Sequence, residues 1–198
     1  MPKPILLIAS AARSKPVRRL VLICLGLGLV TALSIATPLI AVPLALSGQG
    51  AGAHGPMVVG DWGYPLAGDY FKGRGFGWHP VEGCAYCSKN HRGYDMSQDC
   101  GVTVYAAGPG RVIRAGSWGT FGNAVEIDHG GGVVTIYGHM MWDSLKVSDG
   151  THVVAGTPLG LEGRTGTATG CHVHFEVRVN GVAVDPEIFM AARGLPLK

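Results

Sequence analysis

From residue 61 onward, apolar and polar residues alternate in short runs, a pattern typical of β-strands that bury one face. Glycine-rich breaks separate the runs, and the break at 130–132 joins two of them at hairpin spacing. Helical periodicity is absent except for one short turn expected at 186–193. We therefore predict a mostly β, antiparallel domain with strands at 102–106, 111–114, 124–129, 133–137 and 173–179.

A different pattern precedes this domain. Residues 1–19 are basic and contain no acid, and residues 20–46 form an apolar run without charge. Because about 20 apolar residues span a bilayer, we expect one transmembrane helix at 20–46, with the basic segment cytoplasmic and the domain at 61–198 outside. The alternative is secretion after signal cleavage at Ala51-Gly52-Ala53, although signal cores are usually ~7–15 residues long. Residues 47–60 are expected to be a flexible tether.

Composition narrows the class of protein. Charged residues make up 15% of the chain, glycine accounts for 32 of 198 residues, and the formal net charge is only +3. These values exclude a charged disordered chain and argue against a helical bundle. Lysine and arginine form no dense run in the body of the chain, so nucleic acid is not an expected partner.

The domain contains an even set of cysteines, whereas Cys24 lies in the apolar run. An even count in an exported domain predicts disulfides. A redox or zinc motif at Cys84-x-x-Cys87 is the alternative, but the chain lacks the βαβ pattern of thioredoxin-like proteins, and a zinc knuckle would need Cys100 in a second close pair. Four cysteines allow three pairings; among these we expect Cys87–Cys100 and Cys84–Cys171.

Two histidines at the start of the last predicted strand, His172 just before it and His174 within it, flank one valine. Because successive side chains of a strand alternate, His172 and His174 project from one face while Val173 and Phe175 point to the other. Two imidazoles on one face are well placed to hold a metal ion. A His-x-His pair also arises by chance, so alone it is weak evidence.

Two further polar groups lie upstream. Gly93, between His91 and Asp95, disfavours a helix, so we expect a loop entering a strand that turns both side chains toward a common point. In the second strand of the hairpin, alternation predicts Tyr137 and His139 on one face. The glycine before His139 leaves backbone space for a ligand.

Together these motifs resemble the lysostaphin/LytM-type zinc endopeptidases, over residues 60–186. The resemblance rests on His91-x-x-x-Asp95, Tyr137-x-His139, His172-x-His174, Gly122-Asn123, Asp128-His129-Gly130 and Thr165-Gly166-x-x-Thr169-Gly170. It implies a largely antiparallel β-sheet of the duplicated hybrid motif (LytM-like) type, with loops that wall a long groove.

The resemblance also implies that His91, Asp95 and His174 bind Zn²⁺, while His139 and His172 act on the catalytic water and the transition state. Catalytic zinc commonly has three protein ligands and one water, and it lowers the pKa of that water to ~7. No His-Glu-x-x-His motif supplies a glutamate base. We therefore expect His172 to be the general base, with His139 orienting the water or stabilising the oxyanion.

Weaker substrate-binding candidates are Tyr86, Tyr137 and Asn123. The substrate class implied by the resemblance is the peptide stem or cross-bridge of bacterial peptidoglycan. One alternative is a catalytically silent relative that serves as a binding or activator module. The other is a wall-clearing component of an envelope-spanning secretion machine, which would add envelope or secretion-machine partners to peptidoglycan and the membrane.

Overall fold

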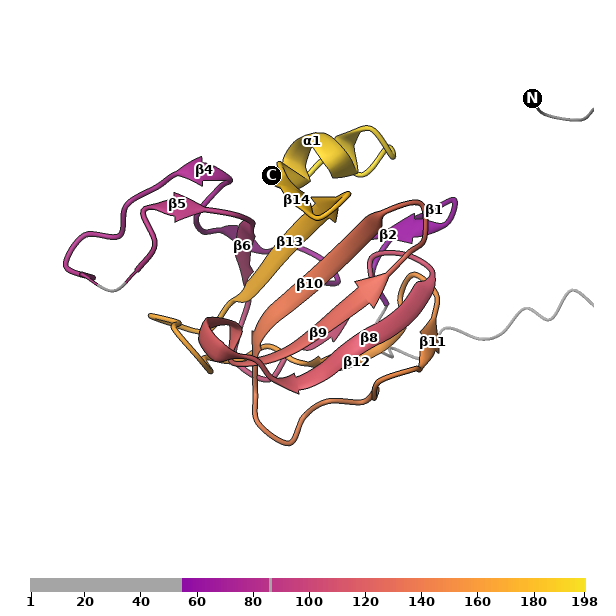
Figure 1. Cartoon of the computed structure of the whole chain (residues 1–198), viewed down its shortest axis with the longest axis horizontal. Coiled ribbons are helices and arrows are strands. Elements are labelled where there is room, and N and C mark those ends of the chain that lie inside the picture. Colours follow the sequence, from indigo (N-terminus) through magenta and orange to yellow (C-terminus); the bar gives the residue numbers. More distant parts are fainter. Residues whose placement is uncertain (1–54, 86) are drawn as a thin grey trace, which may run out of the picture. The chain divides into compact units, whose positions relative to one another are not determined.

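The computed structural model describes residues 55–85 and 87–198, which form a mostly β domain (Figure 1). The expected transmembrane helix at 20–46 lies outside the described residues, as do the basic segment 1–19 and most of the expected tether. Within the described part of the chain, no helix has the length and apolar character needed to cross a membrane.

The main sheet is antiparallel, with the spatial order β11-β8-β9-β10-β13-β6-β3. At its centre, β13 (Val173–Val179) pairs along one side with β10 (Val133–Met140). Along its other side, the first half of β13 pairs with β6 (Tyr94–Ser97) and the second half with β14 (Val182–Val184). Figure 1 shows β8, β9, β10 and β13 side by side, with the small β4–β5 hairpin extending away from them.

The predicted strands are confirmed, with small shifts at their ends. The predicted hairpin is also confirmed, because Val134 of β10 pairs with Asp128 of β9 across the three glycines. The other elements are β1 (Val58–Val59), β2 (Trp62–Gly63), β3 (Phe71–Lys72), β4 (Gly77–Trp78), β5 (Asn90–His91), β7 (Thr103–Tyr105), β8 (Gly110–Ser117), the 3-10 turn Gly119–Phe121, β9 (Asn123–Asp128), β11 (His152–Val153), β12 (Pro158–Leu161) and α1 (Pro186–Ala191).

The hydrophobic core covers one face of the main sheet. From β13 it takes Val173, Phe175 and Val177, all fully buried, and the ring of Phe175 lies 5.5 Å from that of Tyr137 in β10. The expected terminal helical turn is confirmed as α1, where the side chain of Asp185 caps the helix by accepting a hydrogen bond from the Glu187 backbone N–H. The opposite face of β13 carries the polar residues considered below.

The prediction that Tyr137 and His139 share a strand face is wrong. Tyr137 points into the core, whereas the His139 ring lies 4.7 Å from His172 and 5.9 Å from His174 on the other face. The pairing of β10 with β9 shifts register between Tyr137 and Met140, and His139 has a φ of 65°. This irregularity breaks the alternation at the position where it brings His139 to the polar face.

All four domain cysteines form disulfides, as expected, but the expected pairing is wrong: the bonds are Cys84–Cys87 and Cys100–Cys171. Cys100 follows β6 and Cys171 precedes β13. Because these strands are antiparallel neighbours, the end of one lies beside the start of the other. Cys84 and Cys87 instead close a tight turn, in which the Cys87 N–H donates to the Cys84 carbonyl.

Candidate metal centre

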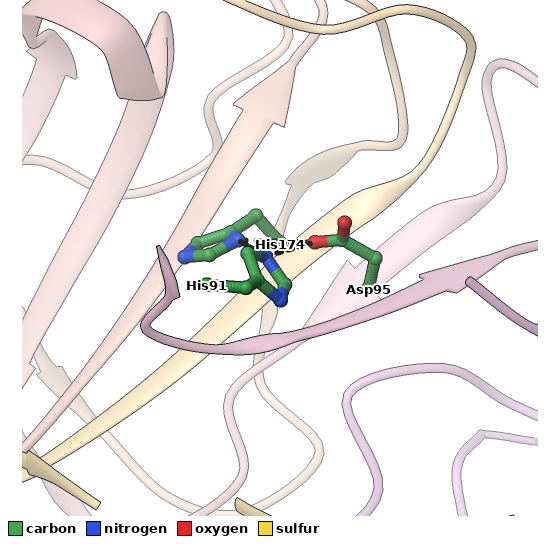
Figure 2. A group of neighbouring side chains, drawn as sticks. All are labelled: His91, Asp95 and His174. Atoms are coloured by element: carbon green, nitrogen blue, oxygen red, sulfur yellow. Dashed lines mark hydrogen bonds and ion pairs between the residues drawn. The ribbon is translucent and has the colours of Figure 1, made fainter. Parts of the chain in front are cut away.

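Three side chains from three strands meet beside β13: His91 of β5, Asp95 of β6 and His174 of β13 (Figure 2). The Nε2 of His91 lies 2.9 Å from the Nδ1 of His174 and 3.1 Å from the Oδ1 of Asp95. The third side of this triangle, from His174 Nδ1 to Asp95 Oδ1, measures 3.0 Å. In tetrahedral zinc sites, bonds of 2.0–2.1 Å separate ligand atoms by about 3.3 Å. The triangle therefore fits three ligands of one zinc ion.

Strand register brings these residues together. In the pairing of β6 with β13, Asp95 is directly opposite His174, and β5 ends at His91 just before β6 begins. The chain passes close to the His174 ring at Gly93, where an added Cβ would lie 2.6 Å from the ring carbon Cε1. The expected loop entering a strand is confirmed, and a side chain at Gly93 would displace the His174 imidazole.

In each imidazole of the triangle, the ring nitrogen that points away from the centre makes a hydrogen bond that fixes the ring. The Nδ1 of His91 donates to the carbonyl of Gly75 at 2.8 Å, so its Nε2 presents a lone pair to the centre. The Nε2 of His174 donates to Oε2 of Glu176 at 3.4 Å. Its Nδ1 can donate a proton to Asp95 when no metal is bound, and loss of that proton leaves a lone pair for a metal ion. Outer partners of this kind fix the tautomer and orientation of metal-binding histidines.

Glu176, which is only 1% exposed, is a further residue of this site that was not predicted from the sequence. Its Oε1 accepts a hydrogen bond from the Nε of Arg178 at 2.6 Å, while its Oε2 contacts His174. The signal was present in the sequence, because the alternation that puts His172 and His174 on one face also puts Glu176 and Arg178 there.

The electrostatics of the triangle favour a cation at its centre. Burial alone would raise the pKa of Asp95, but hydrogen bonds with His174 and His91 outweigh burial and hold that pKa far below its usual range. Burial alone would lower the pKa of His174, but hydrogen bonds with Asp95 and Glu176 raise it to about 9. A positive charge is stabilised here, whether carried by a proton or by a metal ion.

The two other predicted histidines lie beside the triangle, with ring centroids 4.7 Å apart. The Nδ1 of His139 donates to the Thr165 carbonyl at 2.8 Å, and the Nδ1 of His172 donates to the Gly170 carbonyl at 2.9 Å. Because a carbonyl can only accept, the Nε2 of each neutral ring carries a lone pair. Burial, together with the neighbouring histidines, lowers the pKa of His139 to about 4 and keeps its ring neutral at neutral pH.

All five residues line one cavity of about 400 Å³. The 3-10 turn contributes Thr120 and Phe121 to its wall, and the segment before β5 contributes Cys87 and Ser88. The Nε2 of His172 lies 3.7 Å from the Oδ1 of Asp95, which places this lone pair next to the triangle. A water molecule bound to a metal ion in the triangle would therefore have a proton acceptor, the Nε2 of His172, within reach.

Two of the three weaker substrate-binding candidates, Tyr137 and Asn123, do not line this cavity. Tyr137 is fully buried in the core, where its hydroxyl accepts hydrogen bonds from the Ala107 N–H and the Thr135 hydroxyl. Asn123 is 3% exposed, and its Nδ2 donates to the Met141 carbonyl. Both side chains stabilise the fold, contrary to the expectation, while Tyr86 lies outside the described residues.

Comparison with known proteins agrees with this geometry. The model of peptidase family M23 matches residues 89–186. The chain is 38% identical over 109 residues to a peptidoglycan DD-endopeptidase, ShyC of Vibrio cholerae, covering 54% of this chain and 24% of the relative. Indeed, the chain spans about a quarter of the length of the first curated relatives that it matches.

Two solved structures extend the likeness to the fold. The catalytic domain of the antimicrobial peptidase lysostaphin from Staphylococcus simulans is 31% identical, with a TM-score of 0.55, over 62% of this chain and 92% of that domain. A zinc-containing peptidase from Vibrio cholerae is 31% identical, with a TM-score of 0.56, over 66% of this chain and 39% of that chain. The chain belongs to peptidase family M23.

Proposed function

We propose that this protein is a zinc-dependent endopeptidase that cleaves peptide stems or cross-bridges of bacterial peptidoglycan. The observation that carries the proposal is the triangle of His91, Asp95 and His174, which lies in a cavity beside two histidines with available lone pairs. Such a set of three ligands leaves room for one water, as in catalytic zinc sites.

Zinc, when bound, would polarise a water molecule and lower its pKa to about 7. The Nε2 of His172 accepts a proton from that water and returns it to the leaving amine. His139, neutral and with its own Nδ1 committed to the Thr165 carbonyl, offers only an acceptor. Its role is therefore to orient the water rather than to donate to an oxyanion.

The names of two relatives support this substrate class. ShyC is named a peptidoglycan DD-endopeptidase, and a relative in Neisseria meningitidis is named a DD-carboxypeptidase/endopeptidase. We extend peptide cleavage in the cell wall to this chain. The five site positions are filled, which argues against a silent binding or activator module.

We further propose that residues 20–46 anchor the protein in the membrane, with 1–19 in the cytoplasm, 47–60 as a tether and the peptidase domain at 61–198 outside. The two disulfides support an oxidising compartment for the domain. Recovery of a chain beginning at His54 from the medium would instead show secretion after signal cleavage.

The activity is tested by incubating the purified, zinc-loaded chain with defined muropeptides, with and without a chelator, and analysing products by mass spectrometry. We expect cleavage of a peptide bond, its loss with the chelator and its recovery on adding zinc. His152→Ala is the matched control, because His152 is exposed in β11 and does not line the cavity. Binding of muropeptides without cleavage by the zinc-loaded protein would favour the silent module.

A further inference from the structure

The polar face of β13 continues past the metal triangle. Four alternate residues line the cavity from this strand and the position before it: His172, His174, Glu176 and Arg178. A strand rises by about 3.3 Å per residue, so the Cα of Arg178 lies roughly 13 Å along the strand from that of His174. The row of four cavity-lining residues on this face thus ends in the positive charge of Arg178.

Arg178 is held in place by the buried carboxylate of Glu176. Its Nε donates to Glu176, which is almost fully buried and is itself fixed by His174. The guanidinium carbon lies 6.0 Å from the centre of the Trp118 ring. This arrangement uses one of the five guanidinium N–H donors, and the side chain is 25% exposed. Within residues 55–85 and 87–198, the two Nη atoms have no hydrogen-bond acceptor.

The other two arginines that line the cavity differ from Arg178. Arg74 donates through Nε and Nη2 to the carbonyls of His79 and Ser88, so its guanidinium ties together the segments on either side of the turn at Cys84–Cys87. Arg92 is exposed and has no comparable support. Arg178 therefore combines a fixed position with an open pair of donors.

The charge of the cavity favours an anion near this position. Three arginines and two carboxylates line the wall, which leaves an excess of one positive charge among these five side chains before any metal ion is counted. A planar guanidinium with both Nη atoms free matches the two oxygens of a carboxylate, and such paired contacts are strong and directional.

We propose that the Nη edge of Arg178 binds a free carboxylate of the peptide substrate, within about four residues of the bond that is cut. The proposal rests on the proposed function and names its substrate class as peptides with an acidic group close to the scissile bond. The metal triangle acts on the peptide backbone, and Arg178 selects one charge at a fixed distance from it.

The test uses the full chain and a peptidoglycan stem pentapeptide, together with versions in which each free carboxylate is amidated in turn. Binding is measured by isothermal titration calorimetry, and cleavage by mass spectrometry. We expect one amidation to weaken binding to the wild-type protein by about tenfold or more, the range of a hydrogen bond to a charged group. In Arg178→Gln the same amidation should have no effect.

The matched control is Arg114→Gln. Arg114 lies over the same Trp118 ring and pairs with Glu126, but it does not line the cavity, so this variant should keep the full preference for the acid. Zinc content shows whether Arg178→Gln retains the site. If that variant does not fold, Arg178→Lys replaces it and should show a reduced preference, because an ammonium cannot form the paired contact.

The proposal is overturned if no amidation weakens binding to the wild-type protein, if the acid peptide does not bind, or if the variant at Arg178 keeps the full preference. Failure of the proposed function has a different signature: peptides would bind with the predicted preference, but none would be cut by the zinc-loaded protein.

Discussion

The two faces of β13 are built on different principles, although their residues alternate along one strand. The core face consists of Val173, Phe175 and Val177, whose positions follow from apolar packing. The cavity face is held by single polar contacts, each of which fixes one ring or one charge, such as that between Glu176 and His174. Substitutions on the core face should therefore lower the stability of the fold. Substitutions on the cavity face should instead weaken metal binding and catalysis.

The largest functional effect is expected for His172→Ala. The variant should retain its zinc, because the triangle is intact, but kcat should fall by about 10²–10⁴-fold through loss of the general base. Zinc content and steady-state kinetics on a defined muropeptide measure the two properties separately. His139→Ala should also spare zinc and lower kcat. Loss of zinc from His172→Ala would make His172 a ligand and reverse the assignment of roles.

On the core face, Phe175→Ala should destabilise the protein by about 3–5 kcal/mol, the usual cost of removing a buried phenylalanine side chain. Urea unfolding of the wild type and the variant measures this difference. Val182→Ala is the surface control, because Val182 is 66% exposed, and it should change stability by less than about 0.5 kcal/mol. A comparable loss in both variants would mean that Phe175 does not form part of a packed core.

These two faces were not equally predictable. Alternation alone placed His172 and His174 on one face of the strand and Val173 and Phe175 on the other, because side chains along a strand have a period of two. The position of His139 was missed, since it depends on a local shift of register with a positive φ that no periodic pattern encodes.

Contacts between strands that are distant along the chain could not be predicted from the sequence pattern either. The Cys100–Cys171 bond requires β6 and β13 to be neighbours, and alternation within a strand does not specify which strands pair. The three candidate metal ligands were predicted only through the resemblance of their motifs, since nothing in the local pattern at His91 indicates that it faces His174, 83 residues later.

In the metal-free protein, the cavity face should make stability depend on pH. His174 has a pKa raised to about 9 in the folded state, above its ordinary value of 6.5, so its contribution is fully present below pH 6.5 and is lost as the pH rises through 9. We expect the free energy of unfolding to fall over this window, as measured by urea unfolding. The zinc-loaded protein should not lose stability in this way, because the metal replaces the proton. A metal-free protein whose stability is flat from pH 6.5 to 9 would contradict the arrangement.

The smallest effect is expected for Glu176→Gln, which keeps the shape of the side chain but weakens its hold on His174. Loss of such an outer partner typically lowers metal affinity by about 10–100-fold. Competition with a chelator of known zinc affinity measures the change. Glu126→Gln is the matched control, since Glu126 pairs with Arg114 outside the cavity and should leave zinc affinity unchanged. Equal affinities for both variants would remove Glu176 from the metal centre.

The central claim is that His91, Asp95 and His174 hold one zinc ion. Its most direct test is the zinc content of the purified protein after equilibrium dialysis, measured by mass spectrometry of the metal. We predict close to one zinc per wild-type chain and per His152→Ala control, and little or none in His91→Ala and Asp95→Ala. Stoichiometric zinc retained by both ligand variants would contradict it.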